Sequence, residues 1–496
     1  MKGNAPSRAK TTGQVFTPDD IVCMMLDYCG YSGVSILRRH IIDNSCGEGA
    51  FLCLAVARYC KVFLLYNTNT KELRKELECY IHGIEIDKKA YNACLHNLDA
   101  TAADFSITEV HWDVLNADAM EVESYNARMD FVIGNPPYVR VHNLSDRYAA
   151  VKSFQFADGG MTDLYLVFFE LGLRMLSPDG KLCYITPSSW LTSIAGLNLR
   201  SYIFRHRNLL GIIDFGHYQP FLASTYTVIT LMDKRGGHNS LDYSVYDEAL
   251  HNKKSICTLA LRDICINNVF YIALQENLAE LRAVLTTPCT RYVRVKNGFA
   301  TLCDEIFIGN LPFREHVIPI IKASTGKSAE CFFPYDNTGR PLPKKQIFSV
   351  KAVAQYLYTN KETLLKEKTE AQNPTWYLFG RTQAIKDVYV PKIAVSTLVK
   401  DIASLKIKYA PPGTGVYSGL YILSRMPINE IRPIVASNDF LDYVKSLKKY
   451  KSGGYYTFNA HDLETYLNYK LSEKYGKLEK SDKRQPTVFE SYIDFV

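Results

Sequence analysis

Short apolar runs alternate with amphipathic segments through the first half of the chain. The apolar runs predict strands at residues 40–43, 80–86, 131–134, 182–186 and 209–215. Helical periodicity covers residues 50–65, 88–98 and 161–176, and Pro-Asp-Gly at 178–180 predicts a turn. This alternation predicts an α/β fold with a mostly parallel sheet and helices on both faces. Ligands of such sheets bind beyond the carboxyl ends of the strands.

A change of pattern follows the segment 233–240, which is rich in glycine and charge. Beyond it the periodicity weakens, tyrosines multiply, and short strand-like and helix-like pieces mix. A length of 496 residues is enough for two or three domains. The sequence therefore predicts one domain over residues 1–240 and a mixed α/β domain over residues 241–496 that ends in a charged tail.

The two predicted domains differ in charge. Residues 1–240 carry 23 Lys and Arg against 25 Asp and Glu, a net charge of −2, whereas residues 241–496 carry 35 against 26, a net charge of +9. A basic back half fits binding to a polyanion, and a lysine-rich surface in solvent is the alternative.

The cysteines and the apolar content indicate where the protein works. The 13 cysteines form no C-x-x-C pair, which predicts neither a disulfide framework nor a zinc knuckle and favours a reducing cytosol. No apolar run approaches the roughly 18 residues of a membrane helix, and the start has no apolar signal segment. We therefore expect a cytoplasmic protein with no membrane partner.

The most informative stretch is Phe-Val-Ile-Gly-Asn-Pro-Pro-Tyr at residues 131–138. Two consecutive prolines fix φ and remove two backbone donors, so the strand must end there. The resulting corner presents the Asn135 amide, the Pro136 carbonyl and the Tyr138 ring. These groups suit a planar nitrogen such as an exocyclic amine, and a simple strand-ending turn is the alternative.

A glycine-rich turn and two later acids suit a nucleoside-like ligand. In the segment 43–52, Gly47 and its neighbours let the backbone approach a ligand at a helix N-terminus. Glu85 ends the second predicted strand, where a carboxylate suits ribose hydroxyls. Asp118 suits an adenine amine, or it is a helix N-cap. The first turn has no phosphate-binding lysine, which argues against a nucleoside triphosphate.

The order of these motifs resembles the gamma-class, TaqI-like S-adenosylmethionine-dependent DNA adenine-N6 methyltransferases of type II restriction-modification systems. The resemblance covers about residues 11–235. The segment 12–18, Thr-Gly-Gln-Val-Phe-Thr-Pro, lies before the glycine-rich turn and assigns the gamma order. Residues 135–140 match a form frequent in this class, and residues 163–165 and 180–191 resemble its later motifs. The resemblance implies a Rossmann-like methyltransferase domain with S-adenosyl-L-methionine as cofactor.

The family's functional residues carry over one by one. The resemblance implies that the methionine part of the cofactor is bound by Thr17, Asp43, Ser45 and Gly47. It implies that Glu85 binds the ribose, that Asp118 binds the adenine, and that Asn135 also contacts the cofactor. It implies that Asn135 and Pro136 hold the target amine, that Tyr138 stacks on a flipped adenine, and that Phe221 is a second aromatic contact. One departure is visible, because Asn44 stands where many members have proline.

The implied substrate is double-stranded DNA. Residues 291–470 resemble target-recognition regions more loosely, and the segments 297–301 and 376–383 are the closest. Arg381 lies in the second of these and is our best candidate for a DNA contact in this half. The loop 139–160, which contains Arg140, is expected to lie near the target, because long loops in compact domains are usually functional or disordered.

Several rival functions use similar chemistry. Glutamine-side-chain methyltransferases of proteins also use Asn-Pro-Pro-Tyr, an RNA adenine methyltransferase needs the same corner, and cytosine-N4 enzymes usually have serine in place of Asn135. A non-catalytic DNA-specificity subunit is a different class. Because the cofactor motif begins near residue 11, we expect a stand-alone, monomeric methyltransferase without a fused nuclease, either an orphan or partnered with a separate restriction endonuclease.

Overall fold

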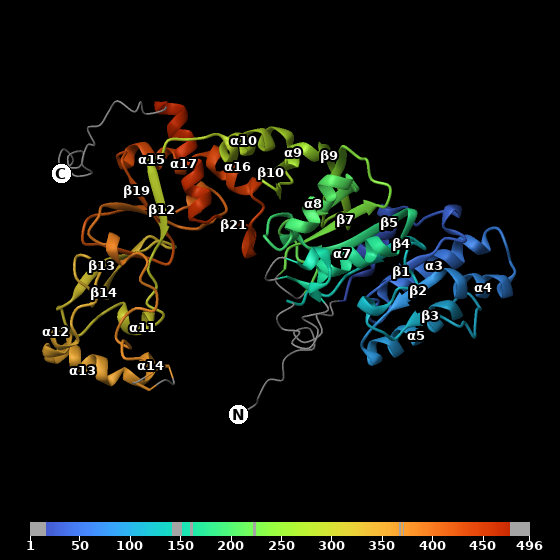
Figure 1. Ribbon diagram of the computed structural model, residues 1–496, viewed down its shortest axis with the longest axis horizontal. Coiled ribbons are helices and arrows are strands. Elements are labelled where there is room, and N and C mark those ends of the chain that lie inside the picture. Colours follow the sequence, from blue (N-terminus) through green and yellow to red (C-terminus); the bar gives the residue numbers. More distant parts are fainter. Residues whose placement is uncertain are drawn as a thin grey trace. The chain divides into compact units, whose positions relative to one another are not determined.

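The chain forms two compact units. The computed structural model describes residues 16–140, 151–158, 162–221, 225–366, 369–370 and 372–476. The units are Met1–Ala279 and Glu280–Val496, and helix α10 (Gln275–Thr286) spans their division (Figure 1). The boundary expected at residue 240 is too early, because the two strands that follow it continue the sheet of the first unit.

The first unit is an α/β domain. Its strands are β1 (Ile41–Asp43), β2 (Ile81–Ile84), β3 (Asp113–Leu115), β4 (Met129–Gly134), β5 (Leu176–Pro187), β6 (Leu209–Asp214), β7 (Thr227–Asp233), β8 (Ser240–Asp247), β9 (Asn252–Ala260), β10 (Cys265–Ile266) and β11 (Val269–Phe270). Its helices are α2 (Asp19–Cys29), α3 (Ala50–Leu64), α4 (Thr70–Tyr80), α5 (Lys88–Ala103), α7 (Leu164–Met175), α8 (Leu197–His206) and α9 (Leu261–Ile264).

One nine-stranded sheet, in the order β3-β2-β1-β4-β5-β7-β6-β8-β9, organises this unit. The five strands from β3 to β5 are parallel to one another. β7 is antiparallel to both of its neighbours, and β9 is antiparallel to β8. The predicted mostly parallel α/β sheet is confirmed, and the carboxyl ends of β1, β2, β3 and β4 meet at one edge.

Hydrophobic cores cover both faces of the sheet. Ile42 and Val132 point into the core formed with α7 and α8, and their neighbours Ile41 and Ile133 point into the core formed with α2, α3, α4 and α5. A sheet buried on both faces needs apolar side chains at successive positions. This explains why its strands read as continuous apolar runs in the sequence.

One local prediction differs from the structure, and several helices of this unit, α4 among them, were not predicted. The turn expected at 178–180 lies inside β5, where Pro178 and Asp179 are exposed and the pairing with β4 shifts register between Met129 and Phe131. The irregularity lets one strand continue through a turn-like sequence. Helix α4 was not predicted, although its N-cap is ordinary: the Asn69 side chain accepts from the backbone N–H groups of the second and third helical residues.

The second unit is mixed α/β, as predicted. It contains the antiparallel sheet β12-β19-β15-β17 and the smaller sheets β14-β13-β18 and β16-β21-β20. The strands are β12 (Val293–Asn297), β13 (Val317–Lys322), β14 (Lys327–Phe332), β15 (Lys392–Val395), β16 (Leu398–Val399), β17 (Ile407–Ala410), β18 (Gly415–Tyr417), β19 (Leu420–Ser424), β20 (Tyr450–Lys451) and β21 (Tyr455–Thr457). The helices are α11 (Asp304–Phe307), α12 (Lys344–Ser349), α13 (Lys351–Thr359), α14 (Lys361–Leu365), α15 (Ile428–Val435), α16 (Asn438–Ser446) and α17 (Ala460–Tyr475).

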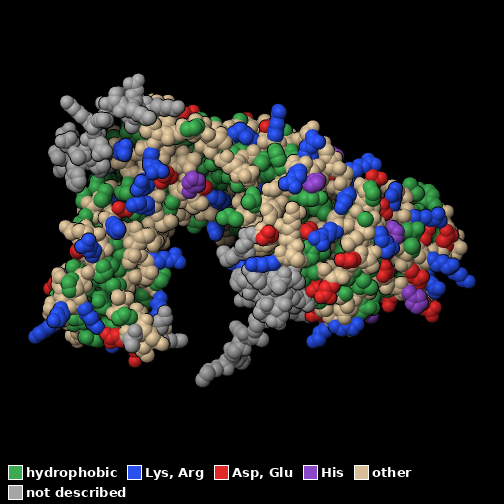
Figure 2. All heavy atoms as spheres, in the orientation of Figure 1, with side chains coloured by type: hydrophobic (Ala, Val, Ile, Leu, Met, Phe, Trp, Pro, Cys, Tyr) green, Lys and Arg blue, Asp and Glu red, His purple; other side chains and the backbone are tan. Residues whose placement is uncertain are grey.

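The observed division between the units sharpens the charge contrast. Residues 1–279 carry 26 Lys and Arg against 30 Asp and Glu, a net charge of −4, whereas residues 280–496 carry 32 against 21, a net charge of +11. On the face drawn in Figure 2, Asp and Glu side chains are frequent over the region of α4 and α5. In the parts of the chain that the structure describes, no helix is long and apolar enough to cross a membrane.

Candidate active site

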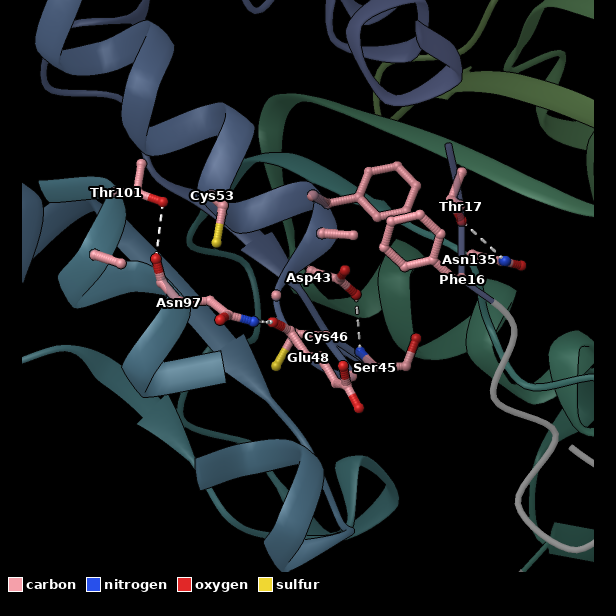
Figure 3. Close-up of a pocket in the computed structure, with 15 residues that line it drawn as sticks. Phe16, Thr17, Asp43, Ser45, Cys46, Glu48, Cys53, Asn97, Thr101 and Asn135 are labelled. Atoms are coloured by element: carbon pink, nitrogen blue, oxygen red, sulfur yellow. Dashed lines mark hydrogen bonds between the residues drawn. The ribbon is translucent and has the colours of Figure 1, made fainter. Parts of the chain in front are cut away.

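A cavity of about 530 Å³ opens at the carboxyl ends of β1 and β4 (Figure 3). The segment before α2, the glycine-rich turn, the start of α3 and the face of α5 surround it. Its lining residues are Phe16, Thr17, Asp43, Ser45, Cys46, Gly47, Glu48, Gly49, Ala50, Phe51, Cys53, Asn97, Ala100, Thr101 and Asn135. The cavity lies where an α/β sheet is expected to bind its ligand.

The glycine-rich turn is held close to α5. Gly47 and Gly49 have φ values of 56° and 93°, a region that favours glycine. A Cβ on Gly49 would lie 2.9 Å from the Cys94 sulfur. Asn97 Nδ2 donates to the Glu48 carbonyl at 2.8 Å, on the far side of the cavity from Asn135 in Figure 3. The turn therefore presents its backbone to the cavity in one defined conformation.

Asp43 is a buried carboxyl group at the centre of this site. Its Oδ1 accepts from the backbone N–H of Ser45 at 3.0 Å, and only 1% of the residue is exposed. Burial raises the pKa of Asp43 to about 7, the Ser45 N–H opposes this rise, and the charge of Glu85 adds to it. A cation in the cavity would favour the ionised carboxylate.

We predict that the binding of a cationic cofactor at this site strengthens as the pH rises. Below pH 7 Asp43 is mostly protonated and must lose its proton to face a cation, so affinity should rise about tenfold between roughly pH 5.5 and 7. Calorimetry with S-adenosylmethionine measures this. Asp43→Asn should bind weakly and without the rise, whereas Asp104→Asn, an exposed control, should keep it. A flat profile for the unaltered chain would contradict the prediction.

Asn135 and Thr17 lie together on one side of the cavity although they are far apart in the sequence (Figure 3). Asn135 Nδ2 donates to Thr17 Oγ1 at 3.1 Å, and both residues line the cavity. Gly134, at the end of β4, lies directly against Asp43, because a Cβ there would lie 2.6 Å from Asp43 Oδ1. The structure thus brings together five of the predicted site residues, namely Thr17, Asp43, Ser45, Gly47 and Asn135.

Glu85 and Asp118 do not line this cavity. Glu85 Oε2 accepts from Gly47 N–H at 2.9 Å and Oε1 from Asp87 N–H at 2.7 Å, so its carboxylate supports the glycine-rich turn. Burial raises the pKa of Glu85. Asp118 caps a short 3-10 helix by accepting from Met120 N–H at 3.1 Å, which is the alternative considered from the sequence. The ribose and adenine roles of these two acids stay predictions.

Tyr138 lies in an aromatic cluster directly after the proline corner. Its ring centroid is 6.2 Å from that of Phe221 and 6.4 Å from that of Tyr165, both in edge-to-face geometry. The Tyr138 hydroxyl donates to the Ile185 carbonyl at 3.2 Å, and burial raises the pKa of this phenol well above its usual value. The structure therefore places together the two aromatic residues that the resemblance assigns to one base.

The two arginine candidates lie in different units. Arg140 is exposed and forms a backbone bridge with Asp163. Arg381 is exposed in the second unit, where its backbone pairs with Ala300. The described residues do not include most of the loop 139–160 or the start of the N-terminal motif, Thr12 to Val15. The roles predicted for them stay predictions.

Asn44, which stands where many members of the family have proline, makes buried polar contacts of its own. It is buried, accepts from the Tyr184 hydroxyl at 2.8 Å through Oδ1, and places its Nδ2 3.8 Å from the Met175 sulfur. These contacts tie the start of the glycine-rich turn to β5 and α7. Asn44 therefore anchors the turn to the sheet and to α7.

We predict that Tyr184→Phe destabilises the chain by about 1–3 kcal/mol, because it leaves Asn44 Oδ1 buried without its donor. Urea denaturation measures the change. Tyr66→Phe is the matched control, since Tyr66 is 70% exposed and should have almost no effect. Equal midpoints for both variants would contradict the prediction.

Sequence reasoning missed the α5 side of the cavity. Asn97 and Thr101 are one helical turn apart and face the glycine-rich turn together with Cys53 of α3. The i, i+4 spacing was visible in the sequence, but polar residues on a helix usually face solvent. Tyr165, whose hydroxyl lies 3.0 Å from Ser189 Oγ, was likewise not assigned to the aromatic cluster.

Comparison with known proteins identifies the relatives of this first unit. Residues 52–221 match the family model described as Eco57I restriction-modification methylase. Type II methyltransferase M.BstVI of Geobacillus stearothermophilus is 29% identical over 276 residues, which cover 52% of this chain and 47% of the relative. The resemblance to type II restriction-modification methyltransferases is confirmed. The Type II restriction enzyme and methyltransferase RM.Eco57I of Escherichia coli is 26% identical over 298 residues, which cover 47% of this chain and 29% of that protein.

Solved structures extend the fold likeness to most of the chain. The Type IIL restriction-modification enzyme MmeI, in complex with DNA, has a TM-score of 0.61 at 12% identity and covers 89% of this chain and 63% of that chain. The DrdV–DNA complex has a TM-score of 0.52 at 13% identity and covers 86% of this chain and 50% of that chain. These likenesses confirm the Rossmann-like fold class. The chain spans about half or less of the two curated relatives.

S-adenosylmethionine is supported as the cofactor by the methylase match, and the cavity fits it. A buried carboxylate, Asp43, suits its positive charge. The glycines at 47 and 49 allow close approach of the backbone, and the buried Ser45 Oγ has no hydrogen-bond partner among the described residues. The site therefore offers both a counter-charge and an unused polar group to a bound cofactor.

Proposed function

We propose that this chain is a site-specific DNA methyltransferase that methylates N6 of an adenine flipped out of double-stranded DNA. One observation carries the proposal: Asn135 lines the cofactor cavity at the end of β4, and Tyr138, three residues on, lies in an aromatic pair with Phe221. The cavity proposed for the methyl donor and the aromatic pair proposed to bind a planar base are thus joined by the Asn-Pro-Pro-Tyr segment.

The chemistry at this corner rests on the chain's own acceptors. When bound, S-adenosylmethionine supplies the methyl group. An adenine amine is a poor nucleophile, because its lone pair is delocalised into the ring. The Asn135 side-chain oxygen and the Pro136 carbonyl accept hydrogen bonds from the two amine N–H groups and favour a more pyramidal nitrogen. The positioning of the amine against the methyl group and the fixed dipoles of these two acceptors then assist a direct in-line transfer of the methyl group, and no nucleophilic side chain is needed.

The aromatic cluster supports base flipping. Taking a base out of the duplex costs a few kcal/mol. Stacking of a base on an aromatic ring contributes about 1–3 kcal/mol, so Tyr138 with Phe221 can offset much of that cost. The hydrogen bond from the Tyr138 hydroxyl to Ile185 holds the ring in place before the base arrives.

We predict that Tyr138→Ala weakens the flipped state by about tenfold, since it removes this stacking. A DNA duplex with 2-aminopurine at the target adenine reports the change as a smaller fluorescence rise on binding. Tyr66→Ala, at an exposed position, is the control and should give the full rise. A full rise for Tyr138→Ala would count against the assignment.

The second unit is proposed as the DNA target-recognition domain. Its net charge of +11 fits a polyanion, and the MmeI and DrdV structures, to which this chain is similar in fold, are described as DNA complexes. We assign the enzyme to the gamma class from the position of the segment 12–18. We further propose that it acts as a monomer, with a separate restriction endonuclease as partner or as an orphan.

Modified-base sequencing of DNA from cells that express this chain tests the proposal. We expect N6-methyladenine at one short recognition sequence, and none in cells that express Asn135→Ala. Methylation of cytosine N4, or of RNA or protein without DNA, would contradict it.

A further inference from the structure

The segments 297–301 and 376–383 of the second unit lie side by side. Ala300 and Arg381 form an antiparallel bridge, with N–H···O distances of 3.4 Å and 3.0 Å. Gln383 Nε2 donates to the Gly298 carbonyl at 3.4 Å. The two stretches that resembled target-recognition regions thus pair with each other. Phe299, Trp376 and Phe379 are buried in the core of this unit, whereas residues 380–383 are exposed.

Leu302, next to this bridge, is held in a strained conformation. Its φ is 63° and 51% of the residue is exposed. A positive φ is uncommon for a residue other than glycine, and such strain persists only where the surroundings impose it. Lys366 Nζ donates to the Leu302 carbonyl at 2.6 Å, and Cys303 N–H donates to Thr301 Oγ1 at 3.1 Å. These bonds hold an apolar side chain at the surface.

Leu302 and Arg381 are neighbours on this surface. The Leu302 side chain lies on Gly380, where a Cβ would be 2.2 Å from Leu302 Cδ1, and Arg381 follows directly. Arg381 is exposed, and it forms no ion pair with a carboxylate of the residues that the structure describes. The Asp304 carboxylate, two residues after Leu302, accepts from the Thr301 hydroxyl at 2.5 Å.

The chemistry of this pair suits base edges better than phosphates. A guanidinium donates two parallel hydrogen bonds to the major-groove edge of guanine, and an apolar side chain contacts a thymine methyl or a base step. Asp304 and Glu305, exposed shortly after Leu302, disfavour a phosphate there, although the Lys366 ammonium at the Leu302 carbonyl offsets part of their charge. A phosphate contact also gives no reason to hold a leucine in a strained backbone.

We propose that Arg381 and Leu302 determine part of the DNA sequence specificity, with Arg381 reading a guanine and Leu302 contacting a neighbouring base. This inference rests on the proposed function, because it needs DNA as the substrate. Residues that support the two side chains, such as Gly380 under Leu302, act only by positioning them.

Selection of bound duplexes from a randomised library tests the inference without needing catalysis. The unaltered chain should enrich one sequence that contains a G·C pair. Arg381→Ala and Arg381→Lys should both lower the preference for that pair by about tenfold. Lysine keeps the positive charge but cannot donate two parallel hydrogen bonds to guanine. Arg340→Ala, an exposed arginine in the same unit, should keep the full preference.

Leu302→Gly is the second variant, since glycine accepts the positive φ. It should unfold at the same or a higher temperature than the unaltered chain, yet show a severalfold weaker preference at a base next to the G·C pair. Unchanged preference with Leu302→Gly and Arg381→Ala would overturn the inference. Full rescue by Arg381→Lys would also overturn it, since a phosphate contact behaves in that way. Arg381-dependent enrichment without any DNA methylation would support the inference and overturn the proposed function instead.

Discussion

Asn135→Ala is expected to lower methyl transfer to DNA by about 10²–10³-fold or more while the cofactor still binds. The substitution removes the side-chain oxygen that is proposed to accept a hydrogen bond from the amine, and the Pro136 carbonyl alone cannot orient the nitrogen. It also removes the Asn135 Nδ2 bond to Thr17, a single contact of 3.1 Å at the rim of the cavity. The loss should therefore appear in the rate of the chemical step far more than in cofactor affinity.

Single-turnover transfer of a labelled methyl group to a duplex with the recognition sequence measures this rate, and calorimetry measures cofactor binding. Thr17→Val is a matched variant, because it removes the same hydrogen bond and keeps the Asn135 oxygen. It should bind cofactor more weakly but retain most of the rate at saturation. Asn252→Ala, at an exposed position, is the neutral control. Turnover by Asn135→Ala close to that of Thr17→Val would refute the catalytic role.

Gly134→Ala is expected to weaken cofactor binding by about a hundredfold and to destabilise the chain by about 1–3 kcal/mol. The new Cβ would lie 2.6 Å from Asp43 Oδ1, closer than any real contact of this kind, and Asp43 is fully packed. The carboxylate must move and lose its bond from Ser45 N–H. Both the counter-charge and the shape of the cavity change.

A double substitution separates these two effects. Gly134→Ala with Asp43→Ala removes the clash, so it should recover stability without recovering cofactor affinity. Gly237→Ala is the control glycine: its φ is 88° and a Cβ there meets nothing within 4 Å, so it tests only backbone strain. Thermal melts and calorimetry on the full chain give both quantities. Normal cofactor affinity in Gly134→Ala would show that Asp43 is not where the cofactor's charge is held.

Local signals predicted the first unit well where a strand or helix is long and periodic. The strands β1, β4 and β6 and the helix α3 were found nearly at their observed bounds. The domain boundary was missed, because glycine and charge at 233–240 mark a surface turn whether or not a sheet continues after it. That β8 pairs with β6 depends on contacts between distant segments, which local pattern does not contain.

The role of Asn44 shows the same limit at a single residue. From the sequence it was only a departure from the family's proline. Its partners, Tyr184 and Met175, lie on β5 and α7, far along the chain, and only packing brings them to the glycine-rich turn. In the same way only the structure shows that Asp118 caps a 3-10 helix, and its role at the cofactor's adenine stays a prediction.

The sequence by itself determined the fold class, the family resemblance and the residues of the Asn-Pro-Pro-Tyr corner, because these depend on short motifs in a set order. Only the tertiary structure decided which candidates share one cavity, how burial moves the pKa of Asp43, and that Leu302 lies beside Arg381. The physical reason is that desolvation and contact are properties of neighbours in space, and most of these neighbours are far apart in the chain.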